Sequence, residues 1–215
     1  MRPRTDGESL TALLRSARSV SMLSICWTSV TGTMTVVLGL LSGSVVLTAF
    51  GAVGAFDAVG SAVLVAHFGH ALRRDAISTS REQLAHLVVS SGLLIVGIAT
   101  ATVSALRLAD GSHAEESLVG IVVAAVSVVA LGYLALVKRR LGRAIPSHAL
   151  VADGWLSLAG CAVAIGTVAG TALAAALGWW WADPVTAVAV AAGAIASGST
   201  NLVSARGAAA DHVGV

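Results

Sequence analysis

Residues 44–68 read SVVLTAFGAVGAFDAVGSAVLVAHF, an apolar run with a single carboxylate, Asp57, near its middle. A helix rises 1.5 Å per residue, so Asp57 would lie roughly 16 to 20 Å from either end of a helix long enough to cross a bilayer. A charge at that depth costs about 2.5 to 3.5 kcal/mol and is tolerated when it faces a cavity, an ion or a partner. Asp57 is therefore a candidate functional residue, and the alternative is a protonated side chain hydrogen-bonded to a neighbouring Ser or Thr.

The composition predicts an all-α integral membrane protein. Of the 215 residues, 56% are hydrophobic and 11% charged, and the mean hydropathy is +0.88. Water-soluble domains carry about 25% charged residues, so this surface could not be solvated by water alone. No segment alternates at strand period as an outer-membrane barrel requires. The two cysteines, Cys26 and Cys161, lie in apolar runs and are interpreted as packing residues.

The length suits six transmembrane helices with short connections. We expect a polar N-terminal lead over residues 1–18, a transmembrane domain over 19–206 and a short tail over 207–215. The fifth segment follows Pro146 and carries a second acid, Asp153, about 10 Å along its helix. The other predicted spans are residues 20–41, 44–68, 87–106, 119–137 and 185–203.

The distribution of basic residues predicts the orientation. All of them except Arg107 fall on one side of this arrangement, including Lys138 and the arginines of the segment KRRLGR, residues 138–143. By the positive-inside rule that side is cytoplasmic, so both termini are expected inside and the protein is expected in the cell membrane as a multi-pass protein. The basic segment could also contact anionic lipid headgroups.

Several classes of function lack sequence support. No HExxH or GxSxG motif occurs and no nucleophile has a base beside it, so we do not expect an enzyme. The basic residues are spread through membrane loops without stacking aromatics, which gives no basis for nucleic acid as a partner. His67, His70 and His86 could collect metal near one membrane face, or be ordinary interface histidines.

Three short motifs carry a family resemblance. A turn at residues 42–45, SGSV, leads into the span with Asp57; the fifth span begins with Ala152 and Asp153; and the segment GWWWADP, residues 178–184, ends it. In this order the features resemble the transmembrane domain of the cation diffusion facilitator (cation efflux) family over residues 15–206. The resemblance implies a six-helix bundle, commonly a homodimer, that exports a divalent cation such as zinc, cobalt or manganese in exchange for protons. It implies no resident cofactor.

The sequence departs from the family at the metal site. The family places two ligands four residues apart in the second span, and these positions are Val53 and Asp57 here. The ligand positions in the fifth span fall on Leu156 and Gly160, which cannot bind metal. The resemblance places Asp153 closer to the entrance than to the site itself. One of the four expected ligands therefore remains.

Two functions follow from these observations. In the first, the protein is a divergent cation transporter that binds its cargo through Asp57 and possible partners Ser61, Thr31, Ser157 and Asp153. Ligation by oxygen alone would favour harder ions over zinc. In the second, the scaffold is kept without transport, and the protein is a structural or regulatory membrane partner.

Overall fold

The computed structural model describes residues 4–74, 79–111 and 118–211 and is helical throughout. Five of the helices, α1 to α5, are long and apolar enough to cross a membrane. This confirms the all-helical membrane prediction. The helices are α1 (Arg4–Ser42), α2 (Val45–Arg74), α3 (Thr79–Asp110), α4 (Leu118–Ala144), α5 (His148–Leu177) and α6 (Ala182–Asp211).

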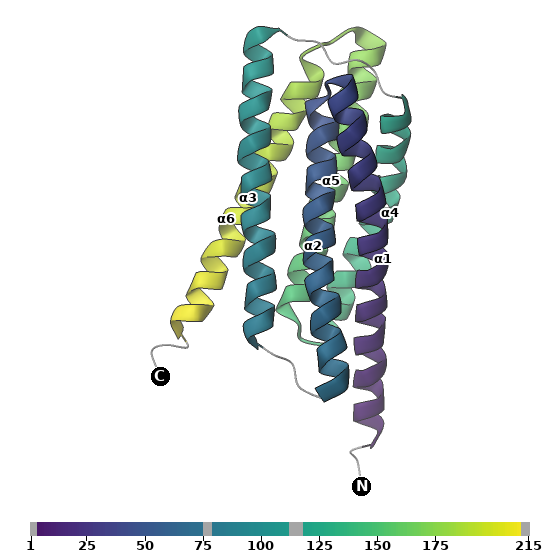
Figure 1. Ribbon diagram of the computed structural model, residues 1–215, viewed down its shortest axis with the longest axis vertical. Coiled ribbons are helices and arrows are strands. Elements are labelled where there is room, and N and C mark those ends of the chain that lie inside the picture. The colour runs from purple at the N-terminus through teal and green to yellow at the C-terminus, as the bar shows by residue number, and fades with distance from the viewer. Residues whose placement is uncertain (1–3, 75–78, 112–117, 212–215) are drawn as a thin grey trace.

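The helices form three closely packed pairs: α1 with α2, α4 with α5, and α3 with α6. Contacts of α2 with α5 and of α1 with α4 join the first two pairs into a four-helix bundle, and the α3–α6 pair lies against α2 and α5. Helix α1 begins and helix α6 ends at the same end of the molecule, drawn at the bottom of Figure 1. We call this the lower end. Helix α1 has 39 residues and extends through most of the polar lead expected over residues 1–18.

Glycines allow α1 and α2 to pack with their backbones nearly in contact. A Cβ atom added to Gly51 would lie 2.6 Å from the carbonyl oxygen of Gly32 and 2.6 Å from the backbone nitrogen of Val36. Backbone atoms cannot move aside as a flexible side chain can, so the whole helix pair would have to separate. This close approach positions α2, and with it Asp57, against α1.

Gly51→Ala is therefore expected to destabilise the protein by about 1 to 3 kcal/mol, the usual cost of overpacking. The matched control is Gly193→Ala on α6, where an added Cβ meets nothing within 4 Å. That variant should be neutral or gain up to about 1 kcal/mol from helix propensity. Unfolding in mixed detergent micelles would measure both, and equal stabilities of the two variants would contradict the packing argument.

The GWWWADP segment ties the upper turns of the bundle together. The carboxylate of Asp183 accepts a hydrogen bond from the Ser44 hydroxyl (2.5 Å) and another from the backbone N–H of Val45 (3.0 Å), at the start of α2. A carboxylate at a helix N-terminus satisfies free N–H groups and complements the helix dipole. Gly43, with φ of 69°, makes the turn before α2, and its carbonyl accepts a hydrogen bond from Arg107 on α3. The α1–α2 turn is thus anchored to both α6 and α3.

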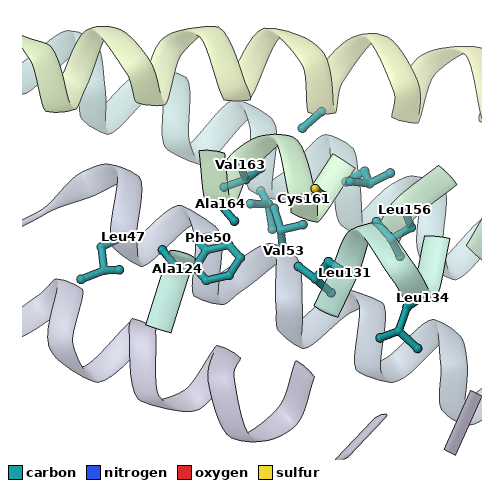
Figure 2. Close-up of a cluster of buried hydrophobic side chains, with 13 residues drawn as sticks. Leu47, Phe50, Val53, Ala124, Leu131, Leu134, Leu156, Cys161, Val163 and Ala164 are labelled. Carbon is teal, nitrogen blue, oxygen red and sulfur yellow. The ribbon is translucent and has the colours of Figure 1, made fainter. Parts of the chain in front are cut away.

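Buried apolar side chains form two main clusters along the bundle axis. The upper apolar cluster joins α2, α4 and α5 with parts of α3 and α6; Figure 2 shows Phe50, Val53 and Leu131 among its side chains. The lower apolar cluster lies toward the end where α1 begins and consists of Leu14, Ala17, Leu64, Phe68, Ile145, Ala149 and Leu150. Asp57 and Asp153 occupy chain positions between the two clusters on α2 and α5.

Candidate functional site

The ammonium group of Lys138 is the centre of a buried polar network. Its side chain is 0% exposed, and Nζ contacts oxygens from three other helices of the four-helix bundle. The contacts are to Ser24 Oγ (2.7 Å), Asp153 Oδ2 (2.8 Å), Ser157 Oγ (2.8 Å), Ser61 Oγ (3.0 Å) and Asp57 Oδ1 (3.4 Å).

Helical spacing explains why these side chains converge. Asp57 and Ser61 are four residues apart on α2, and Asp153 and Ser157 are four apart on α5, so each pair shares one helix face. Side chains on a helix lean toward its N-terminus. Lys138, near the lower end of α4, therefore extends its ammonium upward into the bundle.

Each hydroxyl in the network connects the ammonium to a carboxylate. Ser24 accepts from Lys138 and donates to Asp57 Oδ2 (2.9 Å), and Ser157 accepts from Lys138 and donates to Asp57 Oδ1 (2.9 Å). Ser61 donates to the Asp153 carboxylate, at 3.1 Å from Oδ2 and 3.4 Å from Oδ1. A hydroxyl has one proton to donate and two lone pairs, so each serine can both donate and accept, and the three N–H groups of the ammonium are shared among five oxygens. The network is well satisfied for a polar group in an apolar interior.

With both carboxylates ionised and the ammonium protonated, the site carries one net negative charge and is closed to solvent. It contains two carboxylates and one ammonium, and Asp57 and Asp153 are each 2% exposed. Within the residues that the structure describes, no group of three or more His, Cys, Asp or Glu side chains could hold a metal ion. Any cation held here would depend on two carboxylates and on hydroxyl oxygens.

The structure brings together most of the side chains named as candidates from the sequence. Asp57, Asp153, Ser61 and Ser157 all join the network. Thr31 does not, because its hydroxyl donates to the backbone carbonyl of Trp27. The expectation that Asp153 lies nearer the entrance than the site is wrong, since it shares the ammonium of Lys138 with Asp57.

The other expected ligand positions, Val53, Leu156 and Gly160, have apolar surroundings in the structure. Val53 and Leu156 belong to the upper apolar cluster. A Cβ atom at Gly160 would lie 3.2 Å from a methyl carbon of Leu131 and 4.0 Å from one of Val53. The polar site is thus one helical turn lower on α2 than the family spacing implies, pairing Asp57 with residue 61 and not with residue 53.

The histidines and the basic segment were both expected near the membrane faces. His67 is buried beside Phe68, with ring centroids 5.3 Å apart, and His70 is half-buried, while the side chain of His86 lies outside the described residues. Lys138 is fully buried, so it does not contact lipid headgroups as the basic segment could.

A signal for Lys138 is present in the sequence. The buried residues of α4 form one stripe in which most are three or four positions apart, and Lys138 falls on it, whereas Arg140 and Arg143 are exposed. A lysine in register with a buried stripe indicates an inward-facing side chain. The stripe consists of Gly120, Ala124, Ser127, Leu131, Leu134, Ala135, Lys138 and Gly142.

Comparison with known proteins identifies the family of this chain. No curated protein matches the sequence. The family model described as the cation efflux transmembrane domain matches residues 21–206, which include every residue of the Lys138 network. The chain therefore belongs to the cation efflux transmembrane domain family, a family of cation transporters.

Proposed function

We propose that the protein carries a cation across the cell membrane and that Asp57 and Asp153 bind it. The observation that supports this most directly is the convergence of the two carboxylates, from α2 and α5, on one cationic atom deep in the bundle. Ionisable groups at membrane depth are costly and usually mark an ion pathway. Family membership supports the transport function, and the two converging carboxylates support a cation-binding role for this site.

The proposal includes an arrangement in the membrane. Helix α6 is the sixth span, both termini are cytoplasmic, and the lower end of the bundle faces the cytoplasm. The exposed arginines 140 and 143 near that end support this orientation by the positive-inside rule. We also propose that the protein is a homodimer, as the family resemblance implies.

Transport requires that the site open to each side in turn. The upper apolar cluster separates it from one face, and the lower apolar cluster separates it from the other. Rocking of the helix pairs against one another would open either cluster while the other stays closed. When the cargo leaves, the unbalanced carboxylate charge favours uptake of a proton, which would couple export to proton return. The oxygen-only ligands favour a hard cation.

A second function is supported by the same lysine. The ammonium already neutralises one carboxylate and its hydrogen bonds are well satisfied, which is what a structural ion-pair network needs. On this alternative the protein keeps the transporter scaffold and is a non-transporting structural or regulatory partner in the membrane.

Cation flux into proteoliposomes separates the two functions. Sodium, manganese, cobalt and zinc would be tested with a pH-sensitive dye inside, for the natural protein, for Asp57→Asn, and for Asp110→Asn as a control at an exposed carboxylate on α3. A charge-assisted contact contributes about 1.5 to 3 kcal/mol, so Asp57→Asn should reduce flux at least about tenfold while Asp110→Asn retains it. No flux of any ion by a well-folded natural protein would favour the structural alternative.

A further inference from the structure

We propose that Lys138 makes this site selective for singly charged cations, because its ammonium supplies one of the two positive charges that Asp57 and Asp153 require. This inference rests on the proposed transport function for its physiological meaning, but it concerns the binding preference of the site. The lysine lies between the carboxylates, on α4, and is positioned by hydroxyls from α1, α2 and α5. It occupies the place where a divalent ion would bridge the two acids.

The charge balance of the enclosed site carries the argument. Two carboxylates and one ammonium leave one negative charge, which a singly charged ion cancels. A divalent ion would leave one positive charge in the bundle. The next described buried acid, Asp183, contacts Ser44 and Val45 at the upper turn, about 18 Å along α2 from Asp57, so it is too far away to balance that charge. Apolar clusters above and below also keep counterions away.

One carboxylate oxygen remains available for such an ion. Asp57 Oδ1 and Asp153 Oδ2 face the ammonium, and Asp57 Oδ2 accepts the Ser24 hydroxyl. Asp153 Oδ1 receives only the longer contact from Ser61, at 3.4 Å, among the interactions that the described residues make. A carboxylate oxygen can accept more than one partner, so Asp153 Oδ1 is the atom with the most unused capacity.

The binding preference can be reversed by removing one charge. Lys138→Met keeps an unbranched side chain and removes the ammonium, so the two carboxylates and three hydroxyls become a doubly charged oxygen site suited to a hard divalent ion. Lys138→Arg retains the charge and should retain the preference. Arg140→Met makes the same change in net charge at an exposed position of the same helix and should have no effect.

The test uses the full-length protein in detergent, with the thermal midpoint followed by tryptophan fluorescence during titration with Na⁺ or Mn²⁺ at matched ionic strength. The natural protein, Lys138→Arg and Arg140→Met should respond to Na⁺ at lower concentration than to Mn²⁺. Lys138→Met should reverse this order and change the ratio of the two apparent affinities at least about 100-fold, and Asp57→Asn added to Lys138→Met should remove the Mn²⁺ response.

The outcomes distinguish this inference from the transport proposal. A preference of the natural protein for Mn²⁺, or a Lys138→Met variant that folds but keeps the natural order, would overturn the role assigned to Lys138. If Lys138→Met does not fold, the inference is tested by the order of the apparent Na⁺ and Mn²⁺ affinities in the natural protein and in Lys138→Gln. Flux that depends on Asp57, together with a binding preference for Mn²⁺, would contradict the role of Lys138 and leave the transport proposal standing. The expected preference without any flux would leave a singly charged binding site in a protein that does not transport.

Discussion

Lys138→Met is expected to lower the free energy of unfolding by about 3 to 5 kcal/mol, as removal of one partner from a buried ion-pair network usually does. The substitution leaves Asp57 and Asp153 near one another without the ammonium that now contacts both. It also removes the hydrogen bonds that three serine hydroxyls accept from Nζ. The measurement is unfolding in mixed detergent micelles with no added divalent cation.

The control tests charge imbalance separately from packing. Combining Lys138→Met with Asp57→Asn and Asp153→Asn replaces the charged network by neutral groups of similar size, so most of the lost stability should return. Arg140→Met, at an exposed position, should stay within about 0.5 kcal/mol of the natural protein. If Lys138→Met alone were within that range, the ammonium would contribute nothing to the bundle, and the network would have no energetic meaning.

The fold could be predicted because hydrophobicity over about 20 residues is a strong and local signal. Asp57 could be identified for the same reason, since one carboxylate in residues 44–68 has no local explanation. The role of Asp183 was less visible. Asp183 accepts hydrogen bonds from Ser44 and Val45, which are more than a hundred residues away in the sequence. Only the packing of α6 against α2 brings these residues together.

The burial of Lys138 was not predicted, because two rules apply to the same residues. In the segment KRRLGR the positive-inside rule treats every basic residue alike, but the helix continues through it to Ala144 and gives each one a different direction. Arg139 lies over the ring of Trp155 at 4.0 Å, Arg140 is exposed, and Lys138 faces inward. Their positions around the helix distinguish these three residues, whereas their charge does not.

Asp153 shows the limit of family spacing as a guide. The family spacing predicts ligands at positions 156 and 160, which are Leu156 and Gly160 here, and places Asp153 at the entrance. The side chain that makes Asp153 a member of the site is Lys138, on a helix that the family spacing does not mention. The family ligands were expected on α2 and α5, with Thr31 of α1 as a possible further partner, and a cationic side chain from α4 was outside that expectation.

Phe68→Ala is the second substitution with a large expected effect. Phe68 is 0% exposed and is the largest side chain of the lower apolar cluster, where it packs with residues of α1 and of the α4–α5 turn. Truncating a buried phenylalanine costs about 3 to 5 kcal/mol through lost burial and the cavity left behind. Phe68→Leu preserves most of the volume and should cost less than about 1.5 kcal/mol. Thermal unfolding of the two variants would measure the difference.

The same substitution tests whether the lower apolar cluster closes the site. In a variant with Cys26→Ala and Cys161→Ala, Ser157→Cys reports whether a water-soluble thiol reagent reaches the network. Modification follows the population of open states, and each 1.4 kcal/mol of local destabilisation increases that population tenfold. Phe68→Ala should therefore accelerate labelling at least about tenfold, while Val59→Ala, on an exposed face of α2, should not. A loss of stability without faster labelling would mean that the lower cluster supports the bundle but that access to Asp57 and Asp153 is controlled elsewhere.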